Sequence, residues 1–346
     1  MSHRLMLFAF VLCCSGISTR VDAQQISETY RKVNPSVVIV HVQQKTASPN
    51  PQQGLVSLPS FGSGVLISTD GKILTAAHVV QSADRICVEF SDGQLVPARV
   101  IATSAAADVA LVQLERVPKN DVVSVIGDSS KVEVGDQIFV IGSPYGLSHS
   151  LTVGHVSARY EPNSVVSLPR DAELLQTDAA LNSGNSGSPL FNMRGEVIGV
   201  ATNILSRSGG SEGLGFAVTS KAASQVLLEK KTFWFGLDGI LIEGDVAKAL
   251  NLPQAAGILV QHISEGSPAW RLGLRAGTLR TSVDGEDMLL GGDLLLEING
   301  ISVTAAAGAV DQIYASLNRL KVGERLTSKV LRAGQVIELS TIITTQ

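Results

Sequence analysis

Residues 184–190, Gly-Asn-Ser-Gly-Ser-Pro-Leu, place one serine, Ser186, between two glycines. Flanking glycines allow the backbone to turn sharply and to bring N–H groups close to a bound oxygen atom. A turn with this sequence most often has only a structural role, so whether Ser186 is catalytic depends on the rest of the chain. Two stretches supply that context: Leu-Thr-Ala-Ala-His-Val-Val at 74–80 and Ala-Ala-Asp-Val-Ala-Leu at 106–111.

A histidine and an acid in these stretches complete a possible catalytic set. His78 has small residues on its N-terminal side, and Asp108 enters an apolar run, where an isolated carboxylate is costly unless it is paired. Amide hydrolysis by serine needs an imidazole that removes the hydroxyl proton and a carboxylate that orients the imidazole. We therefore predict Ser186 as nucleophile, His78 as base and Asp108 as orienting acid, with the N–H groups of Gly184 and Ser186 as the oxyanion hole.

Taken singly, His78 could equally be a core histidine and Asp108 a turn-capping acid. The order and context of the three residues favour the catalytic interpretation. The remaining histidines after the N-terminal segment lack comparable neighbours: His41, His149, His155 and His262.

Short apolar runs separated by glycines predict a β-rich first part of the chain, a barrel or a sandwich. These runs are 36–40, 64–67, 72–74, 109–112, 137–141 and 196–200. A segment with Pro and Gln, 48–60, is expected to be an exposed, mobile loop. Helical spacing of apolar residues predicts one helix at 220–231 and another around 310–320. Because a second Gly-rich unit begins after the first helix, we expect one domain at 24–230 and another at 231–346.

The first 23 residues have the layout of a secretory signal peptide: a basic start, an apolar run at 5–14 and Val-Asp-Ala before the expected cleavage site. The alternative, a membrane anchor, would need about 20 apolar residues. Cys13 and Cys14 lie in this segment, which leaves Cys87 alone in an alternating strand. That setting favours an inert thiol over a nucleophile.

The composition narrows the possible functions. The 346 residues carry 27 basic and 31 acidic side chains, a formal net charge of −4, which does not favour nucleic acid as a partner. No group of His, Cys or carboxylate residues has the spacing of metal ligands, so we expect no metal and no organic cofactor.

The combined motifs resemble the Deg/HtrA family of trypsin-like serine proteases over nearly the whole chain after the signal segment. Further similarity lies in Ile-Gly-Ser-Pro-Tyr-Gly at 141–146 and Gln-Thr-Asp-Ala-Ala-Leu-Asn at 176–182. The resemblance implies a mainly β fold: two six-stranded β-barrels of the trypsin-like type, with the active site between them, followed by an α+β PDZ domain. Two positions depart from the family pattern, Ser183 for Pro and Ser188 for Gly, and Ser188 adds bulk beside the active-site turn.

The resemblance also suggests a substrate pocket. Trypsin-like enzymes that prefer basic side chains have an Asp six residues before the nucleophile, where this chain has Ala180. The strand 199–204 would line the pocket with Ala201, Thr202 and Asn203. We therefore expect small or medium apolar side chains before the scissile bond.

The second unit resembles a circularly permuted PDZ domain, with Phe-Trp-Phe-Gly-Leu at 233–237 and Gly-Asp-Leu-Leu-Leu-Glu-Ile-Asn-Gly at 292–300. Such domains add a peptide C-terminus as a strand. The backbone at Phe235, Gly236 and Leu237 would hold the terminal carboxylate. The segment 278–290 is longer than the family's usual link between these motifs.

The resemblance implies a secreted, periplasmic, ATP-independent endopeptidase of unfolded or misfolded polypeptides, regulated by C-terminal peptides and assembled as a homotrimer or larger oligomer. Two alternatives remain. One is a chaperone or peptide sensor with a dormant protease fold. The other is an esterase, which the order His, Asp, Ser and the missing glycine at Ser188 disfavour.

Overall fold

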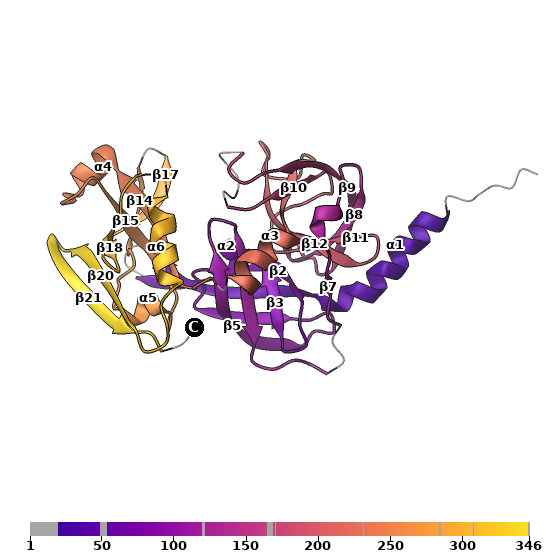
Figure 1. The fold of residues 1–346 in the computed structure, drawn as a ribbon, viewed down its shortest axis with the longest axis horizontal. Coiled ribbons are helices and arrows are strands. Elements are labelled where there is room, and N and C mark those ends of the chain that lie inside the picture. The colour runs from indigo at the N-terminus through magenta and orange to yellow at the C-terminus, as the bar shows by residue number, and fades with distance from the viewer. Residues whose placement is uncertain are drawn as a thin grey trace, which may run out of the picture.

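The computed structural model describes residues 20–48, 54–119, 122–164, 169, 171–230, 232–283, 285–306 and 308–344. Two barrels lie one above the other in the view of Figure 1, with the C-terminal unit on their left and helix α1 (Arg20–Val33) on their right. The apolar part of the predicted signal peptide lies outside the described residues. Among those that are described, no helix is long and apolar enough to cross a membrane.

Six antiparallel strands close the first barrel in the order β1-β2-β3-β6-β5-β4. Their bounds are β1 (Val37–Ala47), β2 (Leu55–Leu66), β3 (Lys72–Thr75), β4 (Arg85–Glu89), β5 (Leu95–Ser104) and β6 (Val109–Leu114). Inward-facing valines, leucines and isoleucines from all six strands fill it. The short helix α2 (Ala77–Val80) follows β3 and carries His78.

For the segment 48–60, residues 49–53 lie outside the described residues, and residues 55–60 are exposed or half-buried as predicted but form a strand instead of a loop. Residues 55–60 belong to β2 and pair with β1, from Ala47 opposite Leu55 to Val42 opposite Ser60. Pro59 is tolerated because this outer part of β2 lies beyond its pairing with β3, which involves only Val65 and Leu66. A proline has no N–H to offer, so it fits a strand edge that needs no donor.

A second barrel follows, ordered β11-β8-β9-β10-β13-β12, and the pairing of β11 with β12 closes it. Its strands are β8 (Gln137–Gly142), β9 (Ser150–Tyr160), β10 (Leu174–Thr177), β11 (Pro189–Asn192), β12 (Glu196–Ile204) and β13 (Gly215–Thr219), with β7 (Val125–Ile126) added beside β12. Single helical turns lie at η3 (Ser129–Lys131) and η4 (Pro144–Gly146), and η1 (Asn34–Ser36) precedes β1. The predicted two-barrel architecture is therefore confirmed.

The predicted helix at 220–231 is α3 (Ser220–Ser224) continued by a π-helical turn, η5 (Gln225–Glu229). Thr219 caps it, because its hydroxyl accepts from the N–H of Ala222. Ala223 and Leu227 are buried against both barrels.

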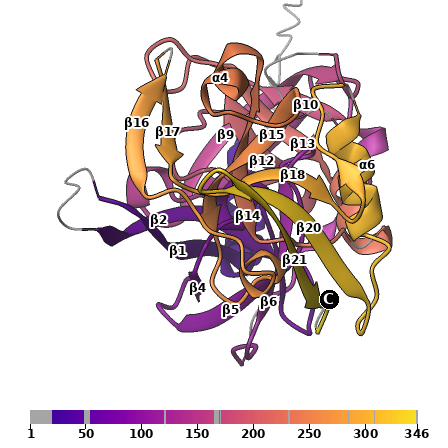
Figure 2. The same ribbon diagram turned by 90° about the vertical axis from the view of Figure 1, so that its left-hand side faces the viewer.

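A five-strand path, β14-β15-β18-β20-β21, forms the main sheet of the C-terminal unit. The strands are β14 (Leu237–Glu243), β15 (Ala256–Ile263), β18 (Leu294–Ile298), β19 (Ile301–Ser302), β20 (Arg325–Arg332) and β21 (Gln335–Ile342); the helices are α4 (Gly244–Ala249), α5 (Pro268–Arg271) and α6 (Ala309–Leu317). Helix α6 overlaps the residues predicted as helical around 310–320. Figure 2 shows α6 on one side of this unit and the hairpin β16–β17 on the other.

The long segment 278–290 forms that hairpin, β16 (Leu279–Val283) and β17 (Glu286–Leu290). Met288 and Leu289 are buried. The amide of Gln261 in β15 exchanges two hydrogen bonds with the backbone of Leu289, at 2.6 and 3.1 Å. The additional residues are thus a packed two-stranded sheet rather than a free loop.

Candidate active site

His78 and Asp108 lie on neighbouring segments of the first barrel and form a close pair. Nδ1 of His78 is 2.9 Å from Oδ2 and 3.0 Å from Oδ1 of Asp108, and the backbone N–H of His78 donates to Oδ1 at 3.0 Å. Asp108 has a positive φ of 52°, which aspartate tolerates better than most residues. The carboxylate is 13% exposed, so the imidazole is held by an acid that water scarcely reaches.

The pKa of His78 lies above its ordinary value of 6.5. Partial burial of the ring lowers this pKa, but the hydrogen bond and the negative charge of Asp108 raise it by more. The carboxylate therefore stabilises the imidazolium that a general base becomes when it takes a proton.

Thr202 is a third member of this cluster, and its role was missed from the sequence. Its hydroxyl donates a short hydrogen bond to Oδ2 of Asp108. A β-bulge explains the orientation, because β12 shifts register against β13 between Ala201 and Asn203. A bulge breaks the alternation of a strand and re-aims one side chain. Both Ala201 and Thr202 are consequently buried and line the cavity, and Thr202 also contacts Asp108.

The turn that carries Ser186 depends on its two glycines. Gly184 has φ +97°, and a Cβ there would lie 2.3 Å from the carbonyl oxygen of Ser143. Gly187 has φ +84°, and its Cβ would lie 2.1 Å from the carbonyl oxygen of Ser63. No other residue fits either position, so the Gly-Asn-Ser-Gly sequence is required by both backbone angle and space.

Hydrogen bonds from both barrels hold the turn in place. The N–H of Ser63 donates to the carbonyl of Ser186 at 2.8 Å, and the N–H of Gly187 donates to the carbonyl of Ala201 at 2.8 Å. The N–H groups of Gly184 and Ser186 have no acceptor in the part of the chain that the structure describes. They remain available for an oxygen atom of a ligand, as an oxyanion hole needs.

Ser188 is accommodated behind the turn without displacing it. The residue is fully buried, and its Oγ has no hydrogen-bond partner among the described residues. Its space comes from Gly142, where a Cβ would lie only 2.1 Å from that oxygen. The bulk that distinguishes Ser188 from glycine is thus compensated by the absence of a side chain on β8.

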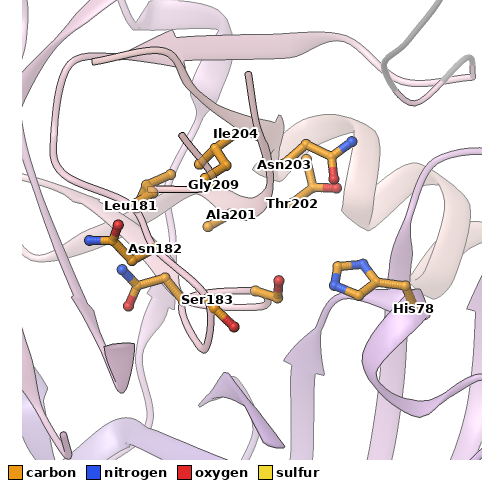
Figure 3. Close-up of a pocket in the computed structure, with 11 residues that line it drawn as sticks. His78, Leu181, Asn182, Ser183, Ala201, Thr202, Asn203, Ile204 and Gly209 are labelled. Atoms are coloured by element: carbon orange, nitrogen blue, oxygen red, sulfur yellow. The ribbon is translucent and has the colours of Figure 1, made fainter. Parts of the chain in front are cut away.

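One cavity of about 260 Å³ brings together two predicted catalytic residues, His78 and Ser186, and three predicted pocket residues, Ala201, Thr202 and Asn203. Its lining comprises His78, Leu181, Asn182, Ser183, Asn185, Ser186, Ala201, Thr202, Asn203, Ile204 and Gly209. Figure 3 shows the imidazole of His78 reaching toward the cavity from the side opposite Asn182 and Ser183. Ser186 lines the same cavity, but no hydrogen bond joins it to His78. Such a bond often tightens only when substrate is bound.

Ala180, which the sequence analysis assigned to the substrate pocket, lies outside the cavity. Its side chain is exposed and absent from the cavity lining, whereas the next residue, Leu181, is 2% exposed and does line the cavity. The position six residues before Ser186 therefore faces solvent in this structure. Leu181, Ala201 and Ile204 give the cavity an apolar side without a charged group.

The other predicted sites lie apart from this cavity. Cys87 is half-buried on β4, and burial raises the pKa of its thiol, as does the charge of Glu89. No group of three or more His, Cys, Asp or Glu residues within the described ranges could hold a metal ion. Phe235, Gly236 and Leu237 lie at the entrance to β14 in the C-terminal unit.

Comparison with known proteins gives three consistent results. The family described as "Trypsin-like peptidase domain" matches residues 62–200. A "Probable periplasmic serine endoprotease DegP-like" of Pseudomonas putida is 40% identical over 250 residues, 70% of this chain and 51% of the relative. One of the same description from Pseudomonas fulva is 34% identical over 331 residues, 83% of this chain and 67% of the relative. The chain thus spans between half and two thirds of these relatives.

Solved structures agree with the sequence relatives. "HtrA-type protease AlgW with decapeptide" has a TM-score of 0.53 and 28% sequence identity, covering 92% of this chain and 98% of that one. The same protease with tripeptide has a TM-score of 0.53 and 29% identity. The names of the curated relatives agree with the predicted periplasmic localisation. The chain belongs to the HtrA/DegP-like family of trypsin-like serine proteases.

Proposed function

We propose that this chain is an exported serine endopeptidase that cleaves unfolded or misfolded polypeptides and is regulated by C-terminal peptides. The proposal rests on the observation that Ser186 and His78 line the same cavity, with Asp108 hydrogen-bonded to Nδ1 of the imidazole. A serine esterase would need the same three groups. The two-barrel fold and the family relationship favour the peptidase.

The geometry supports the usual division of labour in such a triad. Ser186 attacks the scissile carbonyl while His78 removes its proton and later returns it to the leaving amine. Asp108 fixes the tautomer in which Nδ1 carries a hydrogen, so that Nε2 is free to accept. The free N–H groups of Gly184 and Ser186 stabilise the negative oxygen of the tetrahedral intermediate.

The uncharged cavity supports cleavage after small or medium apolar side chains. Leu181, Ala201 and Ile204 offer apolar contact, and the only titratable side chain of the lining is His78. A library of peptides that vary at this position tests the preference. Efficient cleavage confined to peptides with Lys or Arg would contradict it.

The C-terminal unit supports peptide binding because β14 is an edge strand of its sheet. Edge strands offer unpaired backbone groups to an added strand. The N–H groups of Phe235 and Gly236 donate to no acceptor among the described residues, and Gly236 has φ +75°. We propose that this loop holds a peptide carboxylate.

Contacts at Gln81 support communication between this loop and the active site. Gln81 follows helix α2, three residues after His78, and its side-chain amide donates to the carbonyl of Leu237 at 3.0 Å. Its carbonyl accepts from the indole of Trp234 at 3.0 Å and from the hydroxyl of Ser264 at 3.4 Å. A peptide that moves the loop would thus act on the segment that carries the base.

The proposal is tested with casein and the chain without its predicted signal segment, with and without C-terminal peptides and after treatment with a sulfonyl fluoride. We expect fragments of casein, more of them with peptide, and none after the inhibitor labels Ser186, as mass spectrometry would detect. Peptide binding without hydrolysis under every condition would instead support a chaperone or sensor. Light scattering tests the proposed homotrimer or larger oligomer.

Replacing Thr202 with valine is expected to lower kcat about tenfold with little change in KM. Valine keeps the shape but removes the hydroxyl that donates to Asp108. A hydrogen bond to a charged group contributes about 1.5–3 kcal/mol of stabilisation, and a tenfold fall in kcat corresponds to the lower end of this range. Steady-state kinetics on one peptide measure the effect, with Thr202→Ser as the variant that keeps the hydroxyl. A change in KM alone would show that Thr202 acts on substrate binding instead.

A further inference from the structure

The segment between β12 and β13 is folded around one carboxylate. Oε1 of Glu212 accepts hydrogen bonds from the hydroxyl of Ser206 at 3.1 Å, the N–H of Arg207 at 3.0 Å, and the N–H and hydroxyl of Ser208 at 2.9 and 2.8 Å. The N–H of Leu205 donates to the carbonyl of Leu214 at 2.9 Å and closes the segment at its base.

This segment has no buried side chain of its own to hold its shape. Residues 205–214 are exposed or half-buried throughout. The hydrogen bonds to Glu212 also lower the pKa of its carboxyl, so the group stays ionised and keeps accepting near neutral pH. The shape of the segment therefore depends on polar contacts rather than on packing.

A second residue fastens the segment to the active-site turn. Oδ1 of Asn182 accepts from the N–H of Ser211 at 2.9 Å and from the hydroxyl of Tyr145 at 3.4 Å. The carbonyl of Asn182 accepts from the N–H of Asn185, inside the turn that carries the nucleophile, at 2.9 Å. Asn182 itself and Gly209, from the segment, both line the cavity.

We propose that Glu212 and Asn182 are positioning residues that set the width of the substrate pocket and so determine how large an apolar side chain it holds. This rests on the proposed peptidase function. Glu212 fixes the shape of residues 206–212, and Asn182 fixes their distance from the turn of Ser186. Together they hold Gly209 as a wall of the cavity. Long aliphatic side chains of a substrate reach that wall, whereas an alanine side chain does not.

The test compares peptides that differ only in having Ala, Val or Leu before the scissile bond. We expect Glu212→Ala to lower kcat/KM about tenfold for Val and Leu, mainly through KM, and to change it less than about twofold for Ala; pocket contacts of one or a few methylenes are worth about this much. Asn182→Ala should lower kcat/KM more for the Val and Leu peptides than for the Ala peptide. Glu212→Gln should recover part of the loss because its amide oxygen still accepts.

Glu133→Ala provides the matched control, because Glu133 is an exposed glutamate outside the cavity lining. Thermal unfolding confirms that each variant is folded; if Glu212→Ala is not, Glu212→Gln and Asn182→Ala carry the comparison. An equal loss for all three peptides, or no loss for any, would overturn the pocket-width role while leaving the peptidase in place. Failure of the unmodified chain to cleave any peptide would overturn the proposed function itself.

Discussion

Replacing Ser186 with alanine is expected to lower the turnover of casein by roughly a millionfold, as removal of the nucleophile does in comparable triads. The cavity lining contains no cysteine or lysine that could replace the hydroxyl. Folding should persist, because the side chain of Ser186 makes no hydrogen bond in the described part of the chain. Gel and fluorescence assays of casein fragments measure the effect.

The matched control for this variant is Ser164→Ala, which changes an exposed serine in a turn after β9. It should cleave casein at the rate of the unmodified chain. Equal turnover by Ser186→Ala and the unmodified chain would show that another site or a contaminating protease is responsible.

Replacing Asp108 with asparagine is expected to lower kcat about ten-thousandfold at neutral pH. The amide keeps the shape of the carboxylate but offers an N–H to Nδ1, which favours the wrong tautomer of His78. The loss should therefore appear in kcat more than in KM. Asp287→Asn, an exposed position on the hairpin β16–β17, serves as control and should have no effect.

The same variant makes a prediction about pH. A general base must be neutral, so kcat/KM should rise as pH increases through the pKa of His78, which lies above 6.5. Asp108→Asn removes both causes that raise this pKa and leaves burial, which lowers it. The acidic limb of the residual activity should consequently move to lower pH. An unchanged limb would show that it reports a group other than His78.

The titration of His78 should also make the free energy of unfolding fall as pH rises. Because the pKa of the folded state exceeds the unfolded value, the pair with Asp108 stabilises the fold fully below about pH 6.5, where the histidine is protonated in both states. This contribution is lost as pH rises through the folded pKa. The half-exposed ring makes the effect small.

Local sequence was sufficient where the structure needs a particular residue at a particular backbone angle. The positive φ angles and close neighbours of Gly184 and Gly187 exclude any side chain at these positions. The Gly-Asn-Ser-Gly motif therefore indicates the tight turn from the sequence alone. Alternating apolar runs likewise predicted the barrel strands, because each strand buries one face. The paired character of Asp108 followed from the cost of placing a carboxylate beside an apolar strand.

Only the tertiary structure decided features that depend on the register between strands. The bulge in β12 turns Thr202 toward Asp108, although the two residues are 94 positions apart. Pairing with β1 made residues 55–60 a strand where their composition suggested a loop. The exposure of Ala180 and the burial of Leu181 follow from how β10 enters the turn, which no local pattern reveals.

The chain's sequence thus determined its family, its catalytic residues as candidates and its barrel strands, since these rest on local steric needs and on periodic burial. The sequence also suggested three residues that line the cavity, Ala201, Thr202 and Asn203. The supports of the pocket required the fold, because Glu212 and Asn182 act through contacts between separate parts of the chain. The sequence does not show whether a polar residue in an exposed loop only contacts water or forms hydrogen bonds that position the wall of the substrate pocket. What distinguishes the two is the position of hydrogen-bond donors supplied by other parts of the chain.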